Sequence, residues 1–276
     1  LTARERSMPR FADAGITPGP HIHLQPLDVT VALEREAAVR RCEGELGGID
    51  ILVNNAGFST RAVVEHVTEA DRIAQLDINF RSPMELVRLS LPGMRRRRRG
   101  RILNVSSVGG MMAMPTMAVY SASKFALEGA CEELWYEVRP WGIHVTLVEP
   151  GFINSDGFEK VRWTPLGQEA MDRPRHPYHH HYAHMTSFIG QIMKRAPATP
   201  ERVARRVERL MRRRRPPLRA PVTLDAHAFT ALRRGLPRGL YHALLYWMLP
   251  GISTWGPAGA VEDDAWVEAD TETVGW

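Results

Sequence analysis

The sequence predicts an open α/β fold in which helices cover both faces of a doubly wound parallel sheet. Four short apolar segments have the length and composition of buried parallel strands: residues 21–29, 50–55, 100–107 and 142–151. Segments with a helical pattern alternate with them along the chain, as expected of repeated strand–helix units. At 276 residues the chain is long enough to bury one large core of this kind.

Three predicted helices separate or follow these strands. The first covers residues 31–46 and ends at two consecutive glycines. The second covers residues 68–94, with Thr68 as its N-cap and an acidic residue three positions later. The third covers residues 118–139 and ends before Pro140, which cannot continue it.

The pattern changes from residue 152 onward. Residues 152–198 are rich in Pro, His, Met and aromatic residues without a clear period, which predicts an irregular excursion. A basic helix over 200–215 and a last strand in "PPLRAPVTL" then complete a domain that covers residues 1–225. Residues 226–255 are expected to form an apolar helical extension, and residues 256–276 an acidic, disordered tail.

Composition limits the class of protein. The formal net charge is +5, and lysine occurs only at positions 124, 160 and 194. The two cysteines provide neither a disulfide framework nor a metal-ligand spacing, which favours a reducing, cytoplasmic compartment. No apolar run reaches the roughly 18–20 residues that span a bilayer. The apolar segment 236–249 leaves three roles open: membrane-surface contact, closure of a pocket, or a dimer contact.

Two arginine runs and a histidine-rich stretch suggest functions that the sequence favours less. The runs at 95–99 and 212–215 would suit nucleic-acid phosphates, but each lies at the end of a predicted helix, where cations complement the helix dipole. The stretch 176–185 contains five histidines without a strict metal-ligand spacing. We therefore expect neither a nucleic-acid partner nor a metal site.

Polar and glycine residues follow three of the predicted strands at the point where each strand ends. They are the segments 54–57, 106–107 and 150–151. In an open α/β sheet, ligands bind in the crevice beyond the carboxyl ends of the strands. The sequence therefore predicts a ligand site at this edge of the sheet.

Tyr120 and Lys124 lie one helical turn apart in the segment "YSASK". A phenol has an unperturbed pKa near 10 and is a poor base at neutral pH. A cation at i+4 shares its helix face and favours the phenolate, so we expect Lys124 to lower the pKa of Tyr120. An ordinary surface pair is the alternative, and the nearby strand-end motifs argue against it.

Four motifs together resemble the short-chain dehydrogenase/reductase (SDR) family. They are "NNAG" at 54–57, "NVSS" at 104–107, "YSASK" at 120–124 and "EPG" at 149–151. Ser107 precedes the tyrosine by thirteen residues, which is the spacing of that family. The resemblance extends over roughly residues 1–225. It implies a Rossmann-like sheet and an oxidoreductase that transfers a hydride between a nicotinamide cofactor and a secondary alcohol or carbonyl.

The resemblance assigns catalytic roles to four residues. Tyr120 is the general acid/base, Lys124 also holds the nicotinamide ribose, and Ser107 polarises the substrate oxygen. Asn79 would complete a proton relay, because Pro83 has no N–H for the Asn79 carbonyl and a helix kink would free that oxygen for a water molecule. A plain helix break at Pro83 is the alternative.

The same resemblance implies a set of cofactor contacts: Arg4, Asp28, Val29, Asn54, Asn55, Ala56, Gly57, Tyr120, Lys124, Pro150, Gly151, Ile153 and Ser155. Asp28 would bind adenine, and Gly57 would let the backbone approach the adenosine ribose. The start of the chain places Arg4 and Arg6 where an acidic residue would indicate NAD. We therefore expect NADP, with NAD as the alternative.

One part of the family pattern is missing. The family begins with a strand and a Gly-rich turn that hold the pyrophosphate, and this sequence contains neither. We interpret the sequence as an N-terminally truncated part of a longer protein. A chain that truly began at Leu1 would lack a central strand, and its sheet would have an unpaired gap with exposed apolar strand edges. The alternative is a non-catalytic binding protein or remnant related to the family.

The expected substrate is a small lipophilic alcohol or carbonyl compound. The Met-rich loop 109–117 would line its pocket or fill the core, and residues 152–198 would form a lid. We expect a homo-oligomer, with peripheral membrane contact through the apolar extension.

Overall fold

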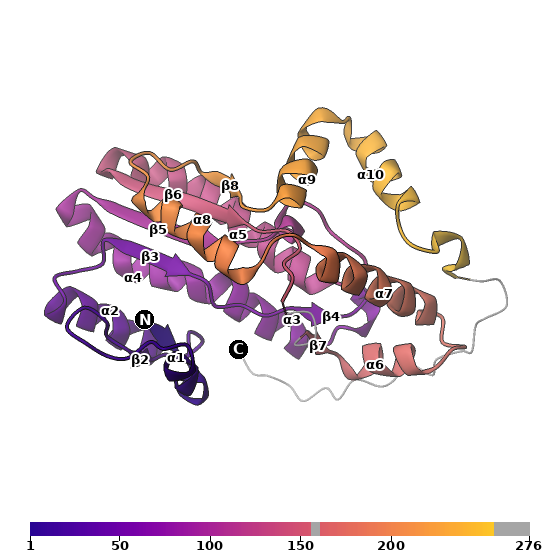
Figure 1. Cartoon of the computed structure of the whole chain (residues 1–276), viewed down its shortest axis with the longest axis horizontal. Helices are drawn as coiled ribbons and strands as arrows, with labels where there is room; N and C mark the ends of the chain where they lie inside the picture. The colour runs from indigo at the N-terminus through magenta and orange to yellow at the C-terminus, as the bar shows by residue number, and fades with distance from the viewer. Residues whose placement is uncertain (156–160, 257–276) are drawn as a thin grey trace.

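Four parallel strands form the central sheet of the computed structural model, which describes residues 1–155 and 161–256. Across the sheet they lie in the order β3 (Ile51–Asn54), β5 (Gly100–Val105), β6 (Ile143–Glu149) and β8 (Arg219–Pro221). Each neighbouring pair is parallel, so the carboxyl ends meet at one edge of the sheet. The predicted α/β fold is confirmed, with helices on both faces (Figure 1).

The remaining elements of the described residues are as follows. The α-helices are α1 (Pro9–Asp13), α2 (Ala32–Glu45), α3 (Glu69–Leu76), α4 (Ser82–Arg97), α5 (Ala118–Val138), α6 (Pro165–Asp172), α7 (His179–Arg195), α8 (Pro200–Arg212), α9 (Leu224–Gly235) and α10 (Arg238–Trp247). The short strands are β1 (Thr2–Ala3), β2 (Gln25–Pro26), β4 (Thr60–Arg61) and β7 (Arg162–Trp163). Turns of 3₁₀ helix lie at Glu5–Ser7, Val64–His66, Val108–Gly110, Arg139–Trp141 and Ile252–Thr254, and a π turn lies at Asp77–Arg81.

Alternate residues of β5 and β6 point to opposite faces of the sheet and build two apolar cores. Ile102 and Leu147 are both 0% exposed and pack with α4 and α5 on one face. Leu103 and Val148 point the other way and pack against α8. Because both faces are covered, these strands are continuous apolar runs, which is why the sequence revealed them.

The strand predicted at 21–29 is much shorter in the structure. Only β2 is extended, and it pairs in parallel with β1 in a separate two-stranded sheet. Pro26 has no N–H to donate to a neighbouring strand, which limits the length of β2. Among the described residues β1 and β3 are not paired with each other, and an apolar groove of about 370 Å³ lies between them, with Ala3 on one side and Val53 on the other. The predicted gap in the sheet is present as this groove.

The single helix predicted over 68–94 is interrupted. Thr68 caps α3 as predicted, because its Oγ1 accepts a hydrogen bond from the Asp71 N–H at 3.1 Å. A π turn then separates α3 from α4, and the Ser82 N–H donates to the Asp77 carbonyl five residues earlier. Pro83 cannot donate to a carbonyl four residues back, so this wider turn accommodates it.

The helix predicted over 118–139 corresponds closely to α5. It ends at Val138, where the chain continues as a 3₁₀ turn that includes Pro140. Gly142 then adopts φ +72°, and a Cβ at this position would lie 2.5 Å from the Arg98 carbonyl oxygen. The turn into β6 therefore requires glycine.

The prediction of an irregular region over 152–198 is wrong for most of its length; residues 156–160 are outside the described residues. The region contains β7, which pairs in parallel with β4, and the helices α6 and α7. Tyr182, Met185 and Ile189 form a buried stripe at helical spacing on α7. Histidine, threonine and serine between them dilute this stripe, which concealed the helix.

The last described helices lie beside the body of the molecule. The predicted helix over 200–215 ends three residues early, at Arg212, and the predicted last strand is β8. Figure 1 shows α9 and α10 projecting from the end of β8 as a pair. No helix in residues 1–155 or 161–256 is long and apolar enough to cross a membrane. The predicted acidic tail lies outside the described residues from position 257 onward.

Removal of the α3 cap tests the link between local sequence and stability. In Thr68→Ala the Asp71 N–H loses its acceptor, and the free energy of unfolding should fall by about 1 kcal/mol in a urea titration. Thr68→Ser keeps the hydroxyl oxygen and is the matched control. An equal loss in both variants would contradict the capping role.

Candidate active site

Three of the predicted site residues line one cavity at the carboxyl-terminal edge of the sheet. Ser107 follows β5, Tyr120 lies in the first turn of α5, and Gly151 follows β6. The cavity has a volume of about 160 Å³. Its other walls are Ser59, Arg61, Val108, Gly109, Met114, Met117, Ser121, Phe152, Val161, Ile189 and Met193. The walls are therefore mostly apolar, and they include the hydroxyl groups of Ser107 and Tyr120, which can donate or accept.

Gly109 lets the tyrosine ring reach the serine. The Ser107 Oγ accepts a hydrogen bond from the Gly109 N–H at 3.0 Å, which fixes the turn after β5. A Cβ on Gly109 would lie 3.0 Å from Tyr120 Cε1 and 3.5 Å from Ser107 Oγ. A side chain at this position would therefore push the ring away.

The predicted lowering of the Tyr120 pKa by Lys124 is wrong for this structure. Burial raises the pKa of the phenol, and a hydrogen bond with Ser107 lowers it by less. Lys124 Nζ lies 5.9 Å from the centroid of the tyrosine ring and donates instead to the Val105 carbonyl at 2.8 Å. The Lys124 ammonium group therefore forms its hydrogen bond with the end of β5 and not with the Tyr120 hydroxyl.

Lys124 is itself strongly perturbed. Its residue is only 6% exposed, and burial lowers the pKa of the ammonium group to about 8, against an opposing effect of Glu128. A buried lysine near a hydroxyl-lined cavity is a chemically competent partner for proton transfer.

Asn79 lies in the π turn and connects three segments. Its Oδ1 accepts from the Phe58 N–H at 3.1 Å, and its Nδ2 donates to the Phe58 carbonyl and to Ser123 Oγ at 3.0 Å. A Cβ on Gly57 would lie 3.1 Å from Asn79 Oδ1 and 3.9 Å from Lys124 Nζ. Gly57, Asn79 and Lys124 therefore come together behind the tyrosine.

Ser123 was not singled out from the sequence, although it lies inside the "YSASK" motif. Its Oγ donates to the Tyr120 carbonyl at 2.7 Å and accepts from Asn79. It is fully buried, and it links α5 to the π turn. Its spacing of three residues from Tyr120 was the available signal.

The turn after β6 is held by the start of α9. The Gly151 N–H donates to Thr223 Oγ1 at 2.9 Å, and the Phe152 N–H donates to Asp225 Oδ2 at 2.7 Å. Asp225 approaches Gly151 so closely that a Cβ there would overlap its carboxylate. Pro150 accepts from the Val108 N–H at 2.9 Å, whereas Ile153 and Ser155 lie outside the cavity wall.

The predicted adenosine contacts lie elsewhere, around the groove between β1 and β3. Asn54 donates to the Asn104 side chain at 2.7 Å and so braces β3 against β5. Asn55, Ala56 and Val29 line the groove with it. The structure thus places the candidate site residues in two separate regions.

Asp28 and Arg4 lie near the end of the groove. Asp28 Oδ1 accepts from the backbone N–H and the hydroxyl of Thr30, and these bonds lower the pKa of the carboxyl, with smaller effects of Arg4 and Arg6. Arg4 is exposed at the end of β1. Both groups are therefore accessible to a ligand with an anionic or hydrogen-bonding end.

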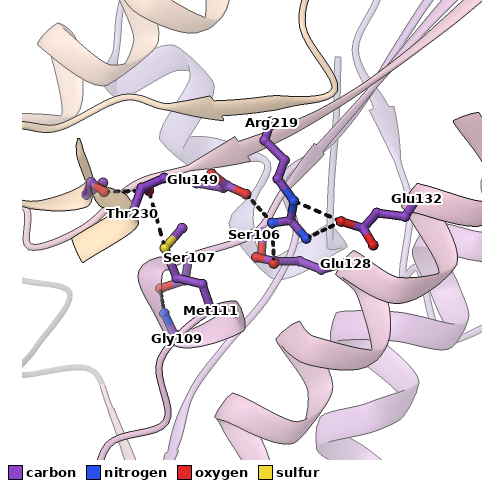
Figure 2. A network of polar contacts seen from close by, with 10 residues as sticks. Ser106, Ser107, Gly109, Met111, Glu128, Glu132, Glu149, Arg219 and Thr230 are labelled. Carbon is purple, nitrogen blue, oxygen red and sulfur yellow. Dashed lines mark hydrogen bonds and ion pairs between the residues drawn. The ribbon is translucent and has the colours of Figure 1, made fainter. Parts of the chain in front are cut away.

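A buried ionic network next to the cavity was not predicted. Arg219 of β8 contacts Glu128, Glu132 and Glu149, and Glu128 also contacts Ser106, the neighbour of Ser107 (Figure 2). The spacing of four residues between Lys124 and Glu128 was the available sequence signal. Three or more side chains that could jointly hold a metal ion do not gather anywhere in the described part of the chain.

Comparison with known proteins gives a consistent family. Residues 5–165 match the profile of a family described as short chain dehydrogenase. The human 17-beta-hydroxysteroid dehydrogenase type 1 is 36% identical over 71% of this chain and 59% of its own length. The 3-ketodihydrosphingosine reductase of Bacteroides thetaiotaomicron is 41% identical over 51% of this chain and 52% of its own length. The chain thus spans just over half the length of these relatives.

Solved structures agree. A short-chain dehydrogenase from Streptomyces avermitilis has a TM-score of 0.70 at 26% identity, covering 89% of this chain and 86% of that chain. A gluconate 5-dehydrogenase from Burkholderia cenocepacia, solved with NADP and tartrate, has a TM-score of 0.51 at 25% identity, covering 64% of this chain and 67% of that chain.

Lys124 predicts a pH dependence of stability. The pKa of its ammonium group is about 8 in the folded chain and ordinarily 10.5, so the folded chain binds fewer protons than the unfolded chain between these pH values. The burial of the Lys124 ammonium group therefore lowers the free energy of unfolding by its full amount below pH 8. This loss disappears as the pH rises toward 10.5. Relative to Lys124→Met, the wild type should gain on the order of 3 kcal/mol of unfolding free energy across this window.

Urea titrations between pH 7.5 and 10.5 measure this difference. The exposed Lys194, replaced by Met, is the matched control and should show no such gain. Parallel stability curves for the wild type and Lys124→Met would show that burial does not perturb this lysine.

Proposed function

Because the chain belongs to the short-chain dehydrogenase family, we propose that the protein interconverts a secondary alcohol and a carbonyl with a nicotinamide dinucleotide. The observation that carries this proposal is the meeting of Ser107, Tyr120 and Gly151 around one cavity, with Lys124 buried behind the tyrosine. Three elements far apart in the sequence converge on hydroxyl groups that a substrate oxygen can reach.

The nicotinamide cofactor would supply or accept the hydride. The residues present fit its reactive end: the Gly151 segment borders the cavity, and Gly57 leaves space beside Lys124 and Asn79. Pro150, Gly151, Ile153 and Ser155 would hold the carboxamide side. Val29, Asn54, Asn55, Ala56, Gly57 and Asp28 would hold the adenosine side along the groove between β1 and β3.

The protein groups handle the proton and the substrate oxygen. Ser107 donates a hydrogen bond to that oxygen, and Tyr120 exchanges a proton with it. Lys124 stabilises the phenolate that forms when Tyr120 gives up its proton, an effect that a bound substrate brings out because it displaces solvent from the cavity. Asn79 and Ser123 hold the backbone of the tyrosine turn and the lysine in register.

A lipophilic substrate suits the cavity. Met114, Met117, Phe152, Ile189 and Met193 form its apolar walls. The two relatives named above act, by their names, on a hydroxysteroid and on a ketodihydrosphingosine, both largely hydrocarbon. We assign the lid over this substrate to residues 152–198 within a domain of residues 1–225.

We also propose a homo-oligomer with peripheral membrane contact. Leu240, Leu244, Trp247 and Met248 form an exposed apolar stripe on α10, at i, i+4, i+7 and i+8. Arg234 on α9 and Arg238 at the start of α10 are exposed and suit anionic lipid headgroups.

A non-catalytic binding protein is the second candidate. It is favoured by the lack of pairing between β1 and β3 among the described residues, because the groove between them lies where the cofactor would pass. Equilibrium titration with NADPH and NADH, followed by steady-state assays on ketones and alcohols, separates the two. Cofactor binding without turnover of any substrate favours this candidate.

Tyr120→Phe is the direct test of the enzymatic proposal. The change removes one hydroxyl group and leaves the ring in place, so turnover should fall at least on the order of 100-fold while the thermal unfolding midpoint stays near the wild-type value. Turnover of a lipophilic ketone by protein from the complete reading frame is the measurement. Retained turnover in the variant would sink the proposed mechanism.

Arg4 tests the preference for NADP. If its guanidinium meets the 2′-phosphate, Arg4→Ala should raise KM for NADPH on the order of tenfold and leave KM for NADH nearly unchanged. Arg10, exposed on the neighbouring α1, is the matched control when replaced by Ala. Equal effects of Arg4→Ala on both cofactors would reject this role.

A further inference from the structure

Arg219 gathers three glutamates at the carboxyl-terminal edge of the sheet. Its Nη1 donates to Glu128 Oε2 and to Glu149 Oε1, each at 2.6 Å. Its Nε and Nη2 donate to Glu132 Oε1 at 3.0 and 2.8 Å. Figure 2 shows the guanidinium pointing into the space between α5 and β6, with the three carboxylates around it.

Each buried partner of this arginine adjoins a candidate site residue. Glu149 directly precedes Pro150 at the end of β6. Glu128 lies one turn after Lys124 on α5, and it accepts a hydrogen bond from Ser106 Oγ at 2.6 Å. Ser106 in turn directly precedes Ser107. Through its two buried glutamates, the Arg219 guanidinium is therefore connected to the segments that carry Ser107, Lys124 and Pro150.

Burial separates these partners from the third glutamate. The side chains of Glu128 and Glu149 are 4% and 0% exposed, whereas that of Glu132 is 49% exposed. Buried ion pairs lose much when one partner is removed, while an exposed pair contributes little. Most of the stability that depends on this network should therefore come from the contacts of Arg219 with Glu128 and Glu149.

We propose that Glu128 and Arg219 are positioning residues that hold Ser106 and the end of β6 in place and keep a carboxylate one helical turn from Lys124. This inference rests on the proposed function, because its effect on turnover requires that Lys124 and Ser107 act in catalysis. It goes beyond that function by assigning part of the activity to residues that do not line the 160 Å³ cavity.

The carboxylate of Glu128 supports the charge of Lys124. Both residues are buried, at 3% and 6% exposure. Burial lowers the pKa of Lys124 to about 8, and Glu128 opposes this by stabilising the ammonium form. Without that carboxylate the lysine loses its charge near neutral pH, and with it the cation that stabilises a tyrosine phenolate.

Glu128 lies among several other charged or titratable groups. The charged or titratable groups that face it are Lys124, Cys131 and Glu132 on α5, Glu149 on β6 and Arg219 on β8. Across an adjoining cavity of about 560 Å³ lie Arg233, Arg234, Arg238, Tyr241 and His242 of α9 and α10. Burial raises the pKa of Glu149 to about 7, which Arg219 opposes, so Glu149 titrates close to the range in which Lys124 does.

The small number of lysines makes a direct experiment practical. Protein labelled with ¹³C at lysine Cε gives one side-chain signal for each of positions 124, 160 and 194, and Lys124→Arg assigns the signal of Lys124. Titration of that signal reports the pKa of Lys124 without any need for activity. In Glu128→Gln it should fall by about one unit, and in Glu132→Gln, which changes the exposed partner of the same arginine, it should stay at the wild-type value.

Kinetics of the same variants complete the test. In Glu128→Gln, kcat at pH 9 should fall on the order of tenfold and KM should change little, because the lower pKa of Lys124 moves the basic limb of the pH profile to lower pH. Arg219→Lys should retain more kcat than Arg219→Met. If Arg219→Met does not fold, Glu128→Gln and Glu132→Gln still decide the question.

The outcomes separate the network from the proposed function. A Lys124 pKa that is the same in Glu128→Gln and in wild type overturns the network, whatever the activity. A loss of kcat with an unmoved lysine assigns Glu128 a purely structural role and also overturns it. If the pKa of Lys124 falls in Glu128→Gln as expected but the wild-type protein shows no turnover, the result supports the network and overturns the proposed function.

Discussion

The parallel pairing of β5 between β3 and β6 is the interaction on which the rest of the molecule depends. The pairing with β6 runs along the whole of β5, from Gly100 opposite Ile143 to Val105 opposite Val148, and β3 pairs with its central residues. Because all three strands run the same way, the residues that follow them meet at one edge. Ser107 and Gly151 are far apart in the sequence. Without this pairing nothing would bring them together in space, and they could not line one cavity.

Polar side chains that are buried at that edge need hydrogen-bond partners within the protein. Asn104 is 0% exposed, and its amide contacts both Asn54 and Cys131. Lys124, Asn79 and Ser123 similarly find partners within the fold. A buried polar group without a partner costs stability, so these side chains are fixed in orientation as well as in position. Rigid supports of this kind are what a reacting group requires.

Much of this arrangement is legible in the sequence, and the reasons are local. Strands β5 and β6 are continuous apolar runs because both faces are covered, and the Thr68 cap depends on residues three apart. Of the strand-end motifs, those at 106–107 and 150–151 contribute Ser107 and Gly151 to one cavity, because strand direction brings them to the same edge, whereas residues 54–56 line the separate groove.

What the sequence did not reveal depends on distant contacts. Arg219 is 70 residues from Glu149 and 91 from Glu128, and nothing local to "PPLRAP" identifies those partners. The raised pKa of Tyr120 comes from burial by loops whose path no pattern predicts. Helix α7 was missed because only three buried positions along it carry its period, and β2 was overestimated because strand length depends on a neighbour.

The π turn at Asp77–Arg81 has a consequence for how this fold tolerates change in length. Such a turn holds one residue more than the same stretch of α-helix, and each helical residue rotates the chain by about 100°. Deleting one residue there would remove the extra residue of this wider turn and rotate α4 relative to α3 by that angle. The apolar side of α4 would then face away from the sheet, and Asn79 would leave Phe58 and Ser123. The extra residue therefore sets the rotation of α4 relative to α3. The number of residues at this point is as constrained as their identity.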